Sequence, residues 1–236
     1  MKLILGFQLS SEKVDINYRS SIMSFIKHLL SNKYEDDFNL LFSDPIMKSY
    51  TFSVYFPNVI MGEDALEVQD KQMSVAISGY DSALIVKLYN ASLSMKNKPY
   101  PMAGNNMILK RMRLDNFPKS LKQINVIKFL CPLVVRKRED GKDSYLTYKN
   151  DDFNKYLNIA VANLFNRMGI SLENQSIKLT PYKVRTTVVK QENISFEVSI
   201  GTFILEGDPQ TLNVLYQTGM GSRRSQGFGM FEVIGG

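Results

Sequence analysis

Hydrophobic residues recur along the chain with two spacings, one typical of strands and one typical of helices. Residues 2–10, KLILGFQLS, form a short apolar run that predicts an opening strand. Residues 18–32 instead carry apolar side chains three and four positions apart, at Ile22, Phe25, Ile26, Leu29 and Leu30. Six segments of the first half predict the order strand, helix, strand, strand, helix, strand: 2–10, 18–32, 48–58, 73–80, 81–95 and 106–116.

The second half of the chain repeats this order. Its six segments are 124–137, 151–169, 178–189, 194–207, 208–219 and 229–234. Asp208 and Pro209 stand at the cap and first position of one predicted helix, where these residue types are favoured. Gly169 follows the end of the other helix, where a left-handed residue is usually glycine.

This repeated order predicts an α+β protein of two tandem ferredoxin-like βαββαβ domains, an architecture that the RNA recognition motif shares. We place the first domain at 1–116 and the second at 122–236. The polar segment 115–123, which holds Pro118, is the best candidate for a linker. Many proteins of this fold bind no RNA, so the architecture alone does not establish function.

Composition narrows the choice of protein class. The chain has 236 residues, 44% of them hydrophobic, which suits a folded protein with a sizeable core. No run of about 18 apolar residues predicts a membrane span, and the start does not read as a cleaved signal sequence. With Cys131 as its one cysteine and His28 as its one histidine, the chain can form no internal disulfide and no zinc cluster. We therefore expect a cytoplasmic protein without a metal or cofactor.

Positive charge is concentrated in the middle of the chain. The formal net charge is +6, and residues 96–149 hold 13 Lys and Arg against four acidic residues. Such an excess is typical either of a solvated basic face or of a surface that binds an acidic partner, nucleic acid included.

The stretch GMGSRRSQGFGMF, residues 219–231, combines four glycines with two adjacent arginines. A dinucleotide fingerprint would need glycine where Arg224 stands, and the Gly-Lys-Ser/Thr of a P-loop is absent from the sequence. Two readings remain, a flexible basic turn and a backbone nest for an anion, with Arg223 and Arg224 adding charge. The octet QGFGMFEV, residues 226–233, resembles a degenerate form of the aromatic signature of the RNA recognition motif.

The line LNVLYQTGMGSRRSQGFGMFEV resembles the C-terminal signature of the CRISPR repeat-processing endoribonucleases of the RAMP superfamily. KSYTFSVYFPN at 48–58 and two stretches within 131–153, CPLVVRKRED and DSYLTYKNDDF, are similar as well. The resemblance implies a metal-independent cut in the repeat of a CRISPR precursor transcript. In that reaction the neighbouring 2′-hydroxyl attacks the phosphate and leaves a 2′,3′-cyclic phosphate and a 5′-hydroxyl.

The resemblance also implies site residues. The family commonly carries its catalytic histidine in or just after the first helix, which makes His28 the candidate acid or base and Lys48 the candidate for holding the phosphate. Lys27 is less favoured because it is adjacent to His28 and is expected to point elsewhere, and Tyr18 and Tyr34 are weaker hydroxyl donors. The loop after the first helix contains no histidine, unlike some members of the family. The expected RNA-binding residues are Gly219, Gly221, Arg223, Arg224, Gly227 and Gly229.

Two other functions stay open at this point. One is a non-cleaving subunit that holds repeat RNA, and the other is a general RNA-binding protein with two recognition motifs. The partners that the resemblance implies are CRISPR repeat RNA or precursor guide RNA, with further subunits of an interference complex and a homodimer as options.

Overall fold

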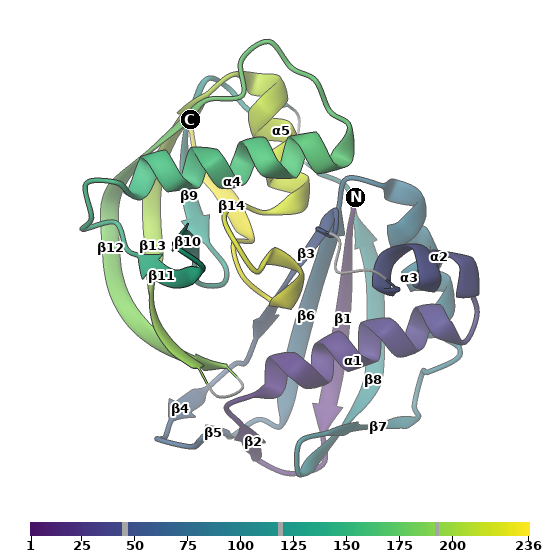
Figure 1. The fold of residues 1–236 in the computed structure, drawn as a ribbon. Coiled ribbons are helices and arrows are strands. Elements are labelled where there is room, and N and C mark those ends of the chain that lie inside the picture. The colour runs from purple at the N-terminus through teal and green to yellow at the C-terminus, as the bar shows by residue number, and fades with distance from the viewer. Residues whose placement is uncertain (44–46, 118–119, 192–193) are drawn as a thin grey trace.

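The computed structural model describes residues 1–43, 47–117, 120–191 and 194–236, and Pro118 of the expected linker lies outside them. Two antiparallel sheets stand beside each other, and each carries helices on one face (Figure 1). Within the described residues, no helix is long and apolar enough to span a membrane.

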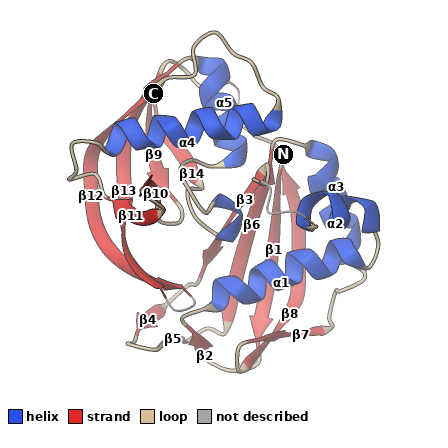
Figure 2. Ribbon diagram, viewed as in Figure 1, coloured by secondary structure: helices blue, strands red, loops and turns tan. Residues whose placement is uncertain are grey.

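The first sheet has the strand order β3-β6-β1-β8-β7. Its first four strands are those of a ferredoxin-like βαββαβ unit, with β1 paired on one side with β6 and on the other with β8. Two helices, α1 and α3, pack on one face (Figure 2). These elements are β1 (Lys2–Leu9), α1 (Tyr18–Ser31), β3 (Tyr50–Tyr55), β6 (Gln72–Gly79), α3 (Ser82–Leu93), β7 (Pro99–Met102) and β8 (Asn105–Asp115).

The second sheet has the order β12-β13-β9-β14, which repeats the same topology. Its elements are β9 (Ile124–Phe129), α4 (Phe153–Met168), β12 (Ile177–Gln191), β13 (Ile194–Gly207), α5 (Pro209–Thr218) and β14 (Phe231–Gly235). β12 and β13 form a long curved ribbon, seen on the outer side of this half in Figure 1. The predicted fold class, two tandem ferredoxin-like units, is confirmed.

Local sequence accounts for the ends of several helices. The Asp208 carboxylate accepts hydrogen bonds from the amides of Gln210 and Thr211, and Pro209 occupies the first turn of α5. Gly169 ends α4 with φ of 65°, in the left-handed region that glycine tolerates best. Strand β1 alternates buried Leu3, Leu5 and Phe7, which face the helices, with half-buried residues on the opposite face.

Several short elements were not predicted. They are α2 (Glu35–Phe42), the small sheet of β2 (Lys13–Asp15), β4 (Val59–Met61) and β5 (Ala65–Val68), the edge strand β7, the 3₁₀ turn η1 (Arg224–Gln226), and the hairpin of β10 (Val135–Glu139) and β11 (Lys142–Leu146). The prediction of one strand over 124–137 is wrong, because β9 ends at Phe129 and β10 starts at Val135. Pro132 lies in the break. Proline has no amide N–H to donate to a neighbouring strand, so it is disfavoured inside a paired strand.

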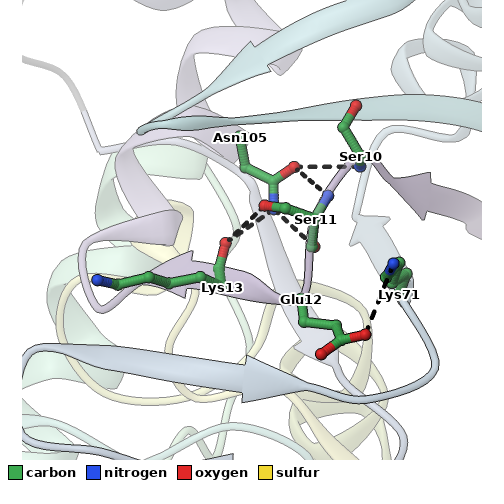
Figure 3. A network of polar contacts seen from close by, with 6 residues as sticks. All are labelled: Ser10, Ser11, Glu12, Lys13, Lys71 and Asn105. Carbon is green, nitrogen blue, oxygen red and sulfur yellow. Dashed lines mark hydrogen bonds and ion pairs between the residues drawn. The ribbon is translucent and has the colours of Figure 1, made fainter.

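A buried amide fixes the turn after β1. Asn105, only 7% exposed, accepts hydrogen bonds from the backbone amides of Ser10 and Ser11 and donates to the carbonyls of Ser11 and Lys13 (Figure 3). Because both ends of this side-chain amide are satisfied, the exit of β1 is held against β8.

Candidate functional site

The glycine-rich segment, residues 219–229, runs from the end of α5 towards β14 and lies between the two halves of the molecule (Figure 1). The hydroxyl of Thr51 on β3 donates to two carbonyl oxygens of this segment, that of Phe228 at 2.9 Å and that of Arg224 at 3.2 Å. Next to this contact, the thiol of Cys131 donates to the Phe52 carbonyl at 3.6 Å. The segment therefore joins the first sheet to the second through buried hydrogen bonds.

The glycines of this segment leave no room for side chains. All four have positive φ, between 73° and 89°. A Cβ on Gly229 would stand 1.9 Å from the Met220 carbonyl oxygen, and one on Gly221 would stand 2.3 Å from the Val134 carbonyl oxygen. Gly221 and Gly229 are required because backbone packs directly against backbone there, and Gly227 because the ring of Phe52 occupies the space of a side chain.

Arg224 points into the junction and is 4% exposed. Its guanidinium donates to the Thr218 carbonyl at 2.8 Å and to the Lys48 carbonyl at 3.0 Å, so it bridges the two halves. Burial lowers the pKa of Arg224 to about 10. The geometry gives this arginine a structural role, and its contact with RNA stays a prediction.

Arg223 lies at a half-buried position with φ of 56°. Its guanidinium donates to the Tyr145 hydroxyl at 2.8 Å and to the Gln226 side chain at 3.1 Å. It also lies 5.3 Å from the centre of the Phe196 ring, within cation–π distance. Arg223 is thus held in place beside the surface that the two halves share.

That shared surface is a groove of about 940 Å³, which we call the basic groove. Met47 and Lys48 line it from the first half, and residues of α4, β10 and the glycine-rich segment line it from the second. Its cationic members are Lys48, Arg136, Arg138, Arg223 and Arg224. Among the lining residues that the structure describes there is no carboxylate, although Asp143 lies 3.3 Å from Arg136. The groove therefore suits a polyanion.

Lys48 lies beside a second lysine. The amines of Lys27 and Lys48 stand 5.3 and 5.5 Å from the centre of the same ring, that of Phe42. Partial burial, and then the positive charge of Lys27, lower the pKa of Lys48. Lys27 thus points to a different side of α1 from His28, as expected, and on that side it lies near Lys48. The ring that gathers both amines belongs to α2, which was not predicted.

His28 projects from another side of α1. Its ring lies 5.2 Å from the ring of Tyr100 on β7, and the Asn32 amide lies 3.0 Å from its Nε2. Strands β7 and β3 are opposite edges of the sheet, about 19 Å apart over four strand spacings. His28 is not among the described residues that line the basic groove, so the structure does not bring its ring and Lys48 into one site.

The two tyrosine candidates are also accounted for. Tyr18 packs edge-on against Phe56 and beside Arg19, and burial raises its pKa. Tyr34 is the N-cap residue of α2, and the amines of Lys33 and Lys87 lie 5.9 and 5.8 Å from its ring centre. In the part of the chain that is described, neither tyrosine lines the groove.

Comparison with known proteins agrees with this architecture. Three solved structures each match over 99% of both chains: "An RAMP protein binding different RNA substrates" (20% identity, TM-score 0.86), a Cas6-related protein from Pyrococcus furiosus (18%, 0.86) and "CRISPR associated protein Cas6" (18%, 0.79). At these identities the likeness shows the fold.

Sequence comparison adds the family. A search of curated protein sequences gives no match. The family model described as "CRISPR associated protein Cas6, C-terminal" matches residues 115–233, half of the chain, and this region includes the whole glycine-rich segment. This chain belongs to the Cas6 family of CRISPR-associated proteins.

Proposed function

We propose that this protein binds CRISPR repeat RNA in the basic groove and cuts it there without a metal ion. The observation that carries the proposal is the groove itself. In a chain of the Cas6 family, it gathers Lys48, Arg223 and the arginines of β10, with no acidic residue among its described lining. Phosphate contacts from such cations supply most of the affinity of nucleic-acid binding.

The reaction is a transfer at phosphorus. The 2′-oxygen next to the scissile phosphate loses its proton to a base and attacks phosphorus, and the 5′-oxygen leaves as it takes a proton from an acid. The products are a 2′,3′-cyclic phosphate and a 5′-hydroxyl. The phosphorane between them carries extra negative charge, which fixed cations stabilise.

Lys48 is the residue we assign to that charge, with Lys27 beside it. Burial and a like charge lower the pKa of Lys48, so its amine gives up a proton at a lower pH than an ordinary lysine does. His28 can act as acid or base only if the scissile phosphate lies at the Tyr100 edge of the sheet instead. Lys48 and His28 therefore imply two different positions for the cut, and mutating each residue distinguishes them.

The test is cleavage of the cognate repeat RNA in EDTA, with the cut and its end groups mapped. Wild-type protein should give a single cut with a cyclic phosphate. Lys48→Ala should lower the single-turnover rate about a hundredfold, because a fixed cation on the phosphorane is lost. Lys33→Ala, which removes an exposed lysine just after α1, should cut at the normal rate.

His28→Ala decides between the two locations. A normal rate with this variant places the cut at the groove, while loss of cleavage with normal RNA affinity places it at the Tyr100 edge. Wild-type RNA binding without any product would instead support a non-cleaving repeat-binding subunit. The position of the one histidine outside the groove favours that alternative.

A further inference from the structure

The first sheet has a second face, opposite to the face covered by α1 and α3. One row of directly paired residues crosses it: Tyr55 pairs with Ser74, Ser74 with Gly6, and Gly6 with Arg111. Residues paired in this way project on the same side of an antiparallel sheet. The row therefore sets an aromatic ring at one end, a guanidinium at the other, and two small residues between them. We call it the Tyr55 platform.

The centre of the platform is hollow. A cavity of about 350 Å³ is lined by Gly6, Ser74, Tyr55 and Arg111 together with their neighbours. The strand pairing of β1 with β8 shifts between Gly6 and Phe7, so β8 contains a bulge at this point. Bulges change the direction of side chains and occur often beside functional sites. With no side chain on Gly6, the floor lies at the backbone.

The charge of the platform is positive. Lys110 and Arg111 line the hollow, and none of its described lining residues is acidic. Tyr55 is 67% exposed, although a tyrosine usually buries much of its ring. An exposed aromatic ring on a surface that also carries cationic side chains is the combination with which proteins bind single-stranded nucleic acid.

We propose that the Tyr55 platform binds a single-stranded segment of the RNA substrate, with one base stacked on Tyr55 and a neighbouring phosphate on Arg111. This inference rests on RNA being the substrate in the proposed function. Tyr55 is seven residues beyond Lys48, about 23 Å along an extended chain. The segment on the platform is therefore a different part of the RNA from the part in the basic groove.

The test measures the affinity of the full chain for its repeat RNA by fluorescence anisotropy. Tyr55→Ala should weaken binding about tenfold, because stacking on an aromatic ring is lost, while Tyr55→Phe should bind as the wild type does. Tyr182→Ala is the matched control, since it removes a tyrosine of similar exposure (63%) from β12. Arg111→Ala should reduce the slope of log affinity against log salt by about 0.7.

Gly6→Val tests the hollow without removing a contact. Valine suits a strand, and a Cβ at Gly6 would lie 3.4 Å from the Arg111 Cβ and 3.8 Å from the Arg111 carbonyl oxygen, both ordinary contacts, so the variant should stay folded. It should nevertheless weaken RNA binding, because its side chain fills the floor. Melting curves for all variants establish that loss of affinity is not loss of fold.

Unchanged RNA affinity in folded Tyr55→Ala and Gly6→Val proteins would overturn the platform, as would a change in self-association of Tyr55→Ala with no change in RNA affinity. The outcome is separable from that of the proposed cleavage. If the wild type binds repeat RNA without cutting it and Tyr55→Ala binds less, the platform stands and the nuclease proposal fails. If Lys48-dependent cleavage occurs and Tyr55→Ala binds RNA normally, the nuclease proposal stands and the platform fails.

Discussion

At the scale of single residues, the most informative contact is the ring of Phe42 shared by the amines of Lys27 and Lys48. The charge of Lys27 lowers the pKa of Lys48, so the two ammonium groups are close enough to repel each other, and each is attracted to the Phe42 ring. The folded protein thus holds two positive charges together before RNA arrives. A phosphate placed between them would remove the repulsion, which gives this position a preference for anions.

The coupling between the two lysines predicts a shift that NMR can measure. Partial burial lowers the pKa of Lys48 first, and the charge of Lys27 lowers it further. Lys27→Met removes the second cause, so the pKa of Lys48 should rise part of the way to its ordinary value in a carbon-13 titration. Lys33→Met should leave it unchanged, and an identical Lys48 titration in the Lys27→Met protein would contradict the coupling.

The sign of the matching stability effect follows from proton binding. Because the pKa of Lys48 is lower in the folded protein than in the unfolded chain, the folded state binds fewer protons between the two values. The contribution of Lys48 to the free energy of unfolding therefore increases as pH rises through that alkaline interval. In the Lys27→Met protein this increase should be smaller.

The sequence indicated some of these residues and not others. Lys48 could be found because it opens the stretch KSYTFSVYFPN, which the family resemblance covers. The approach of Lys27 to Lys48 could not, since it depends on Phe42 of α2, a helix of eight residues that the sequence analysis did not predict. His28 was expected at the reaction centre, but its packing against Tyr100 depends on an edge strand that the sequence did not reveal.

At the scale of elements, the glycine-rich segment acts as a packed connection more than as a loop. It begins at the end of α5, turns through η1 and enters β14 with its backbone pressed against Met220, Val134 and the ring of Phe52. Sequence alone suggested backbone exposed to an anion, because glycine allows close approach by any group. Here the approaching group is the protein itself.

Substitution at Gly229 should show how tight this packing is. In Gly229→Ala the new Cβ meets a carbonyl at 1.9 Å, so β14 or α5 must shift, and we expect a loss of more than about 3 kcal/mol in the free energy of unfolding. Gly169→Ala is the control: its φ is also positive, at 65°, but a Cβ there has no neighbour within 4 Å. It should lose only about 1 kcal/mol in urea titrations. Equal losses in the two variants would mean that the positive φ, and not close packing, requires glycine at position 229.

Long elements with a clear period were predicted well, and short ones were missed. The four long helices and the eight strands of the two βαββαβ units are all present, apart from the division of 124–137. The small sheet of β2, β4 and β5 has strands of three or four residues, too few to show a period. The hairpin of β10 and β11 is polar on both faces, so no alternation marked it.

At the scale of the whole molecule, the two halves are joined by buried polar groups. The Thr51 hydroxyl, the Arg224 guanidinium and the Cys131 thiol all cross from one half to the other. Each would leave a buried group without its partner if the halves separated, which is costly. We therefore propose the units 1–116 and 122–236 as structural domains that unfold together.

Calorimetry can test this cooperativity. The wild type should unfold in one transition with equal calorimetric and van't Hoff enthalpies. Thr51→Val keeps the shape of the side chain but removes the donor to two carbonyls, so it should lower the free energy of unfolding by about 1–3 kcal/mol. Thr187→Val, on the less buried part of β12, should change it little. Two separate transitions in the wild type would show that the halves fold independently.

The place of Cys131 has a practical consequence. As the one cysteine of the chain it lies where the halves meet, and burial raises the pKa of its thiol to about 12. The closed molecule should thus hide it from alkylating reagents, which attack thiolates. Alkylation of Cys131 would then require the junction between the halves to open, so the rate of modification reports how often the junction opens. RNA that bridges the two halves would lower the rate of Cys131 alkylation without contacting the cysteine.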